Sequence, residues 1–305
     1  MPSSISNSRI AGGARALRAI AVATLVAIGC YAGLIALWQP TIGAGQDQES
    51  DVAIAVERFL YADAVPDAVI VGSSQAWRIP PRALGPRVAN LALAAHNALT
   101  GLEIIARSGR VPHRIYVEIN MIGRVRHDRF VDGVFAEPGY TLKRYVAALR
   151  TTYQPANVAI SLLRRAVRGR DEVDYPRVQD RALHDTLIAG GEQSMTQAPE
   201  PRVLAGDVAK LQRLAGVLSS AGAELVFFEM PIEPQLEEAN AVVAVREAVH
   251  AAFPADRACW NQDAPPLGLV SNDGTHLDSE TAAKFWTTLA ATSCQRPAVA
   301  AMPGK

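Results

Sequence analysis

The chain has 305 residues, with 30 basic and 30 acidic side chains, and therefore no net charge at neutral pH. It has no excess positive charge to attract nucleic acid, and its aromatic content of 6% shows no interleaving with basic residues of the kind that binds single strands. Its three cysteines and six histidines show no Cys-x-x-Cys pair or His-rich spacing. We therefore expect no nucleic-acid partner, no metal and no other cofactor.

The first feature in chain order is an uncharged apolar segment at residues 19–38. As a helix it reaches about 30 Å, which is one bilayer crossing. Three arginines precede it and Trp38 closes it, so the positive-inside rule places residues 1–18 in the cytoplasm. A cleaved signal peptide is the competing interpretation, but its apolar core is usually shorter. We expect a single-pass inner-membrane protein with a periplasmic, extracytoplasmic C-terminal domain.

The remainder of the chain alternates between short apolar runs and segments with helical spacing. Residues 39–50 are predicted as a linker, and residues 51–295 are enough for one large domain. The expected strands are 68–71, 88–93, 114–118 and 224–228, and the expected helices are 51–60, 98–108, 155–167, 203–221, 237–253 and 279–291. This order predicts an α/β fold, a three-layer α/β/α sandwich with a mainly parallel sheet, preceded by one transmembrane helix.

Residues 124–201 interrupt the alternation, because they are rich in Arg and Asp and carry few strand signals. We interpret them as an insertion that contains one helix, followed by a polar, Gly-containing stretch up to Pro201 that is expected to be partly mobile. Four arginines form either a solvated helix face or a contact for an acidic polymer or lipid head groups: Arg164, Arg165, Arg168 and Arg170. Residues 296–305 are predicted to be a disordered tail.

Two cysteines, Cys259 and Cys294, fall in the part of the chain expected outside the membrane. In an oxidising compartment such a pair can form a disulfide that ties the last helix to the preceding loop. Two free buried thiols are the alternative interpretation.

Three short polar stretches occur in the order of a serine acyl-transfer site. Gly72-Ser73-Ser74-Gln75 and Glu118-Ile119-Asn120 each follow an apolar run, and Asp273-Gly274-Thr275-His276 precedes the last helix. The carboxyl ends of parallel strands are where ligands bind in open sheets. The spacing of three between Asp273 and His276 lets a turn place the carboxylate against one imidazole nitrogen and leaves the other nitrogen for a serine.

Each stretch also has a plainer interpretation. A serine after a strand often caps the next helix, and Asp-Gly-Thr-His is also a common polar surface turn. The ordered combination favours catalysis, with a serine nucleophile, His276 as general base and Asp273 as its orienter. Ser73, Gln75 and His96 are candidate pocket residues.

These motifs resemble those of the SGNH (GDSL-like) hydrolase superfamily, which has a flavodoxin-like sandwich fold. Within it they are most similar to membrane-anchored proteins of polysaccharide O-acylation, such as the alginate O-acetylation proteins and the D-alanine transfer protein of teichoic acid synthesis. The resemblance covers roughly residues 66–290 and leaves the insertion unmatched. It implies that Ser74 is the nucleophile, and that the backbone N–H groups of Ser74 and Ala95 and the Asn120 side chain form the oxyanion hole.

The chain departs from the family pattern at two points. The stretch Asn90-Leu91-Ala92-Leu93-Ala94-Ala95 resembles the second sequence block of the family, with Ala95 where that block usually has glycine. The stretch with Asn120 lacks the Gly and Asp that usually flank this Asn. An added methyl group at Ala95 narrows the oxyanion pocket or demands a different backbone angle.

The resemblance implies a membrane-anchored extracytoplasmic serine O-acyltransferase or esterase that acts on a cell-surface or secreted polysaccharide. The implied partners are this polysaccharide and a membrane-bound O-acyltransferase that exports acyl groups. The alternative is a catalytically inactive assembly or glycan-binding component of a polysaccharide modification complex.

Overall fold

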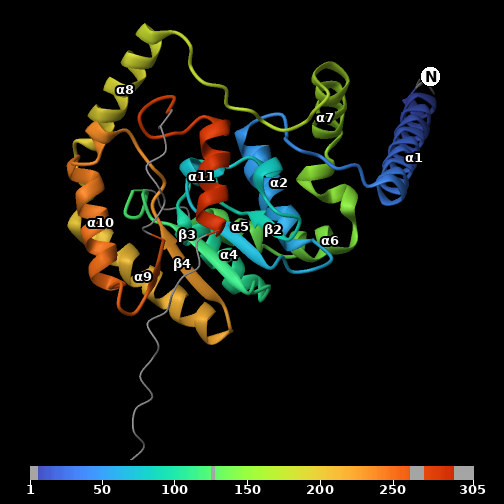
Figure 1. The fold of residues 1–305 in the computed structure, drawn as a ribbon. Helices are drawn as coiled ribbons and strands as arrows, with labels where there is room; N and C mark the ends of the chain where they lie inside the picture. Colours follow the sequence, from blue (N-terminus) through green and yellow to red (C-terminus); the bar gives the residue numbers. More distant parts are fainter. Residues whose placement is uncertain (1–5, 125–127, 262–270, 292–305) are drawn as a thin grey trace, which may run out of the picture.

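The computed structural model describes residues 6–124, 128–261 and 271–291. Its sheet has five parallel strands in the order β2-β1-β3-β4-β5 (Figure 1). The strands are β1 (Ala68–Val71), β2 (Val88–Asn90), β3 (Arg114–Glu118), β4 (Glu224–Phe228) and β5 (Cys259–Trp260). The predicted α/β class with a parallel sheet is confirmed.

Helices connect these strands and extend beyond them at the N-terminus. The α-helices are α1 (Ser6–Trp38), α2 (Gln48–Leu60), α3 (Ser74–Trp77), α4 (Ala98–Ser108), α5 (Asp128–Val134), α6 (Gly139–Tyr145), α7 (Pro155–Arg168), α8 (Arg181–Met195), α9 (Pro201–Ser220), α10 (Asn240–Ala252) and α11 (Ser279–Ala291). Short 3-10 helices are η1 (Pro81–Ala83), η2 (Ala147–Leu149), η3 (Thr151–Tyr153) and η4 (Pro234–Leu236).

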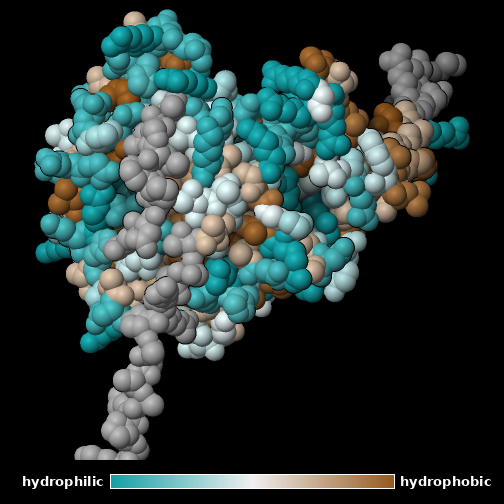
Figure 2. Space-filling model, in the orientation of Figure 1, coloured by the Kyte–Doolittle hydropathy of each residue, from teal (hydrophilic) through white to brown (hydrophobic). Residues whose placement is uncertain are grey.

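One helix among the described residues is long and apolar enough to cross a membrane, the Arg15–Trp38 part of α1. Its large apolar side chains are exposed, including those of Leu25, Val26 and Leu37. Figure 2 shows apolar residues along this helix. A core helix of a soluble domain would bury such side chains. The expectation of one apolar helix able to span a membrane is confirmed.

Both faces of the sheet are covered. All four residues of β1 are buried, and they alternate between two apolar clusters. Val69 and Val71 pack with residues of α2, α4 and α9, whereas Ala68 and Ile70 pack with residues of α11. A parallel strand covered on both faces requires a continuous apolar run of this kind, and this run allowed β1 to be predicted from the sequence.

Gly101 allows α4 to approach β1 closely. A Cβ atom at this position would lie 2.7 Å from Val71 Cγ1 and 3.1 Å from the Leu91 carbonyl oxygen. We expect Gly101→Ala to lower the free energy of unfolding by about 1–3 kcal/mol, because overpacking outweighs the better helix propensity of alanine.

The matched control for this prediction is Gly206→Ala in α9, where nothing lies within 4 Å of the added Cβ. This variant is expected to be neutral or to gain up to about 1 kcal/mol. Urea unfolding measures the free energy of unfolding of both variants. Equal changes in Gly101→Ala and Gly206→Ala would contradict the close approach of α4 to β1.

Several predicted boundaries differ from the observed ones. The predicted helix 51–60 begins earlier, at Gln48, because the Asp47 carboxylate accepts a hydrogen bond from Ser50 N and caps α2. The segment between α1 and α2 is therefore residues 39–47 rather than a linker of 39–50. β5 was not predicted, since two residues carry no readable period.

The insertion is more ordered than its sequence indicates. Its described residues contain four α-helices, of which only α7 was predicted. α8 carries Gly190 and Gly191, which lower helix propensity. At Gly191 a Cβ atom would lie 2.7 Å from the Asp273 carbonyl oxygen, so this glycine lets α8 pack on the Asp273 turn. The partial mobility expected of the polar stretch up to Pro201, in which α8 lies, stays a prediction. The predicted tail, 296–305, lies outside the described residues.

Candidate active site

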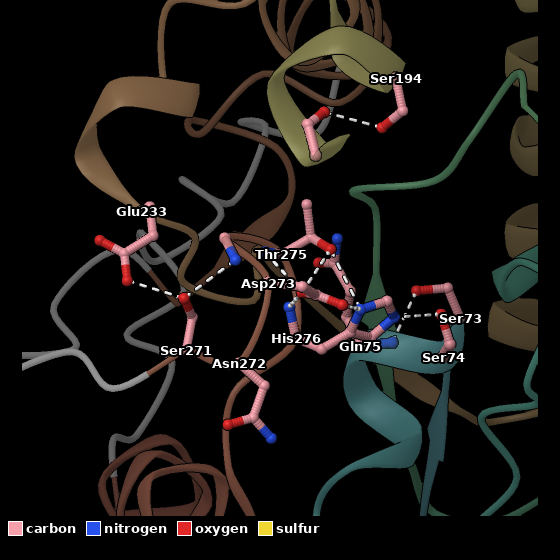
Figure 3. A network of polar contacts seen from close by, with 12 residues as sticks. Ser73, Ser74, Gln75, Ser194, Glu233, Ser271, Asn272, Asp273, Thr275 and His276 are labelled. Atoms are coloured by element: carbon pink, nitrogen blue, oxygen red, sulfur yellow. Dashed lines mark hydrogen bonds and ion pairs between the residues drawn. The ribbon is translucent and has the colours of Figure 1, made fainter. Parts of the chain in front are cut away.

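Three side chains from distant parts of the chain meet at the carboxyl end of β1. The Ser74 Oγ and His276 Nε2 atoms lie 2.7 Å apart, although 202 positions separate them in sequence. His276 Nδ1 lies 2.8 Å from Asp273 Oδ2 (Figure 3). The hydroxyl, imidazole and carboxylate therefore form one continuous hydrogen-bonded chain, which is the arrangement of a nucleophile, its base and the orienter of that base.

The two adjacent serines have different roles. Ser73 is buried and extended, and its Oγ accepts a hydrogen bond from Gln75 N at 3.2 Å, so Ser73 is the N-cap of α3. Ser74 is the first residue of α3, and its hydroxyl points to His276. The plainer interpretation of a capping serine thus holds for Ser73 alone. Gln75, the residue after Ser74, is also buried.

A tight turn fixes the carboxylate of Asp273 against the imidazole. Asp273 Oδ1 accepts hydrogen bonds from Thr275 N at 3.0 Å and from His276 N at 2.8 Å. Gly274 adopts a φ of +87°, and its N–H donates to Ser271 Oγ at 3.0 Å. Because a positive φ strains other residues, glycine suits this position. The turn leaves Oδ2 free to face Nδ1 of His276.

Electrostatics keep Asp273 ionised. Burial opposes its charge, but hydrogen bonds from His276 and Thr275 and the electrostatic attraction of His276 outweigh burial and lower the pKa of Asp273 well below its ordinary value. An ionised carboxylate accepts the Nδ1 hydrogen of His276 and leaves Nε2 as an acceptor toward Ser74. This proton assignment follows from the hydrogen-bond partners.

Ala95 occupies the backbone conformation that a glycine would favour. Its φ is +62°, in the left-handed region, and its side chain is exposed. An L-residue costs roughly 1–2 kcal/mol there. Of the two consequences expected from alanine at this position, the unusual backbone angle is the one observed. The oxyanion role of the Ala95 N–H stays a prediction.

Asn120 is engaged with the segment after β4. Its Nδ2 donates to the Met230 carbonyl oxygen at 2.9 Å, and its Oδ1 accepts from Met230 N at 2.8 Å. One Nδ2 hydrogen remains for another acceptor. Asn120 lines the same small cavity as Gln75, the residue after Ser74. Its oxyanion role therefore also stays a prediction.

His96 packs in an aromatic contact. Its imidazole is buried and lies 4.6 Å from the Phe130 ring, centroid to centroid. Its backbone N–H donates to Leu93 O at 3.1 Å. These contacts suit a core histidine, and a role for His96 in a substrate pocket stays a prediction.

Glu118 is a site component that our sequence reasoning missed. It is 1% exposed at the end of β3, and its Oε2 accepts a hydrogen bond from Ser73 N at 2.6 Å. A Cβ atom at Gly72 would lie 2.6 Å from this Oε2, so glycine permits the contact. Glu118 therefore holds the turn that carries Ser74. The available signal was an acidic residue directly after the apolar run Ile115-Tyr116-Val117.

The pKa of Glu118 leads to a pH-dependent prediction. Burial raises this pKa above its ordinary value of 4.5, against the opposing effect of hydrogen bonds from Ser73 and Asn120. Above pH 4.5 the unfolded chain releases a proton that the folded chain retains, so this group costs stability as pH rises toward the folded pKa.

Glu118→Gln removes this titration and retains an acceptor for Ser73 N. We expect the free energy of unfolding of the variant, relative to wild type, to increase as pH rises from 4.5 to neutral. Urea unfolding across this range measures it. If the free energy of unfolding of Glu118→Gln relative to wild type does not change with pH, the raised pKa of Glu118 is contradicted.

Part of the insertion lies against both halves of the site. Tyr175 Oη accepts a hydrogen bond from Trp77 Nε1 at 3.1 Å, and Tyr175 N donates to Ser279 Oγ at 2.9 Å. Val178 N donates to Asn272 Oδ1 at 3.0 Å. The insertion thus joins α3, which begins at Ser74, to the segment that carries Asp273 and His276, and it contributes to the surroundings of the candidate site.

The remaining predictions concern cysteines and metal ions. Cys259 is disulfide-bonded and Cys30 is a free thiol. Cys294, the predicted partner of Cys259, lies outside the described residues. Within the described parts of the chain, no group of three or more His, Cys, Asp or Glu side chains is placed to hold a metal ion.

A functional assignment for this chain depends on its own residues and their geometry. The connected side chains of Ser74, His276 and Asp273 are the feature with the clearest chemistry. No protein-family model matches the chain, and comparisons with curated proteins and with solved structures also give no match.

Proposed function

We propose that this protein is a membrane-anchored, extracytoplasmic serine O-acyltransferase or esterase of the SGNH type that acts on a polysaccharide. The observation that carries the proposal is the hydrogen-bonded chain from Ser74 through His276 to Asp273, with links of 2.7 and 2.8 Å. The proposal includes a three-layer α/β/α sandwich. Apolar clusters on both faces of the sheet support it.

The reaction begins when Ser74 Oγ attacks the carbonyl carbon of an acyl ester and His276 Nε2 takes the hydroxyl proton. Backbone N–H groups of Ser74 and Ala95, with the free Nδ2 hydrogen of Asn120, stabilise the resulting oxyanion. Each such donor typically contributes about 3 kcal/mol to lowering the barrier. Asp273 stays ionised throughout and stabilises the imidazolium.

Collapse of the tetrahedral intermediate breaks the bond to the leaving group, which receives the proton from His276. The acyl group then remains on Ser74. An acceptor hydroxyl attacks the acyl carbon and gives its proton to His276, and this proton returns to Ser74 Oγ as the acyl bond breaks. A sugar hydroxyl as acceptor gives transfer, and water gives hydrolysis.

The apolar helix α1 favours transfer over hydrolysis. A secreted degradative esterase gains little from a membrane tether, whereas a transferase has to receive acyl groups at the membrane. The positive-inside rule places the site outside the cytoplasm, in the periplasm if the anchor spans an inner membrane. Coenzyme A thioesters are cytoplasmic, so a membrane-bound acyl-exporting O-acyltransferase is the proposed donor partner.

A second candidate is a non-catalytic assembly or glycan-binding component with the same fold. Alanine at position 95 and the engagement of Asn120 by the Met230 backbone are the observations that favour it. In that case Ser74→Ala would leave acylation of the surface polymer intact. The enzyme proposal expects polymer acylation to be lost although the variant is made and anchored.

The test uses the purified full chain in nanodiscs with an activated aryl acetate, in the presence and absence of a soluble polysaccharide. We expect release of the aryl alcohol and its loss in Ser74→Ala. Acetyl groups on the polysaccharide identify a transferase, and acetate alone identifies an esterase. A folded wild-type chain that releases no aryl alcohol contradicts both enzyme assignments.

A further inference from the structure

Helix α7 is amphipathic, and its polar face is turned toward the protein. Asn157 and Ser161 are both 0% exposed. Asn157 Oδ1 accepts from Gln46 N at 2.9 Å, its Nδ2 donates to Thr151 O at 2.7 Å, and Ser161 Oγ donates to Asp171. These contacts fix the rotation of α7 about its axis. The usual orientation of a surface helix, with its polar face in water, is therefore reversed.

The outward face of α7 is apolar. Leu163 is 63% exposed and Val167 is 73% exposed, with Leu162 beside them. The neighbouring α6 and η2 expose Tyr145, Val146 and Leu149. We call these six residues the α6–α7 apolar surface. Figure 2 shows apolar residues near α7 and along α1 on the same side of the molecule. Large exposed apolar residues gathered on one side of a molecule are typical of an interaction surface.

The α6–α7 apolar surface adjoins the end of α1. Tyr31 Oη of α1 donates to the Tyr153 carbonyl oxygen at 2.6 Å. Ile35 of α1 is buried in a cluster with Ile42 and with Val158 of α7. Ala147 and Ala148 of η2 pack against the same cluster, so the elements that carry the surface lie against α1.

The depth of these contacts along α1 fits a lipid–water boundary. Tyr31 precedes Trp38 by seven residues, which corresponds to about 10 Å along a helix. If Trp38 marks the boundary, the segment that binds Tyr31 lies at the depth of about 5–10 Å that interfacial amphipathic helices reach.

Charge at the edge of α7 also suits a lipid surface. The last turn carries Arg168, which is exposed, and Arg165, which is exposed but also contacts Asp171 and the Thr41 carbonyl oxygen. The first turn has no acidic residue. Arginines beside an exposed apolar helix face bind the phosphate of anionic lipids. A transmembrane helix of a partner protein would instead require an apolar surface without such a charged edge.

The segment is held rigidly to the domain. The Glu57 carboxylate of α2 is buried and accepts hydrogen bonds from Thr151 N at 2.8 Å and from Thr152 N at 2.9 Å. Lys143 Nζ, from α6, lies 3.0 Å from the same carboxylate. The α6–α7 apolar surface is therefore attached to the domain core through Glu57 of α2.

We propose that the α6–α7 apolar surface is a second membrane contact, in which α7 lies at the lipid–water boundary beside α1. The proposal rests on the insertion of α1 in the bilayer. A single helix with residues 39–47 as its tether leaves a domain free to tilt, whereas two contacts fix the orientation of the domain. The orientation of the Ser74 site relative to the membrane is thereby fixed.

The experiment measures lipid exposure by spin labelling of the full chain in nanodiscs that contain anionic lipid. Leu163→Cys and Val167→Cys are labelled in a Cys30→Ala background, and native Cys30 is labelled in the wild type as the marker for α1. Val217→Cys in α9 is the matched control, because Val217 is 58% exposed and lies in another helix. Cys259 is disulfide-bonded. These substitutions are on the surface and leave the core unchanged.

We expect the ratio of accessibility to oxygen over accessibility to a water-soluble nickel chelate to be several-fold higher at positions 163 and 167 than at 217. A water-like ratio at 163 and 167 with a lipid-like ratio at Cys30 overturns the second contact and leaves the anchor intact. A water-like ratio at Cys30 overturns both the second membrane contact and the insertion of α1 in the bilayer. If labels at positions 163 and 167 are shielded from both reagents in native membranes but not in nanodiscs, a protein partner covers the surface and the proposed lipid contact is overturned. The readout does not depend on ester turnover, so it is separate from the test of catalysis.

Discussion

Replacement of Ser74 by alanine is expected to lower kcat/KM for an activated ester by about 10⁵-fold. The substitution removes the atom that would form the acyl bond, so that only binding and oxyanion stabilisation remain. The fold should be unaffected, because the Ser74 hydroxyl hydrogen-bonds to His276 rather than to the core. Steady-state release of the aryl alcohol, with circular dichroism to verify folding, measures this loss.

The neighbouring serine provides the control. Ser73 caps α3 through its contact with Gln75 N, so Ser73→Ala should lower the free energy of unfolding by about 1 kcal/mol. Its ester turnover should remain far above that of Ser74→Ala. If Ser73→Ala were the inactive variant and Ser74→Ala retained turnover, the assignment of the two serines would be wrong.

The second large effect is expected from Asp273→Asn, which should lower kcat by about 10⁴-fold. The carboxylate accepts the Nδ1 hydrogen of His276, whereas an amide can donate to Nδ1 and so place the imidazole hydrogen on Nε2. Nε2 then cannot accept the Ser74 proton. Substrate binding should change much less than turnover, and a comparison of kcat with KM measures this difference.

An exposed aspartate beside another histidine is the matched control. Asp185 lies 3.9 Å from His184 Nδ1 and is far more exposed than Asp273. Asp185→Asn should leave kcat unchanged. Equal losses in both variants would show that general charge, rather than orientation of His276, determines turnover.

The same aspartate gives a stability prediction with a definite sign. The folded pKa of Asp273 lies below its ordinary value of 3.8, so its stabilisation is present above that value and lost as pH falls toward the folded pKa. Asp273→Asn should therefore destabilise the fold more at neutral pH than in acid. If the difference in the free energy of unfolding between wild type and Asp273→Asn were the same at neutral and at acid pH, the fold would not specifically stabilise the ionised carboxylate.

Local patterns were sufficient for much of the sheet. The predicted bounds of β1, β3 and β4 match the observed ones, because each is a short apolar run buried on both faces. α4 and α11 also have their predicted bounds. α4 has a capping Asn97 and a C-terminal Gly109, which are signals that a sequence carries locally.

What the sequence could not provide depends on contacts between distant residues. Gly191 lowers the helix propensity of α8, yet it is the residue that lets α8 pack on the Asp273 turn. Asn120 is paired with Met230, which is 110 positions away, and no local pattern indicates this pairing. The left-handed backbone of Ala95 was indicated in the sequence only by the glycine that the resembled family usually has at this position. In contrast, the spacing of Asp273 and His276 was enough to predict their mutual hydrogen bond.

The most direct test of the central claim is the intact mass of the full chain after brief exposure to an activated aryl acetate, followed by peptide mapping. We predict one added acetyl group on the wild type, located on Ser74. It should be absent from Ser74→Ala and form slowly in Asp273→Asn. An unmodified, folded wild-type chain, or an acetyl group that persists in Ser74→Ala, would contradict a Ser74 acyl-enzyme.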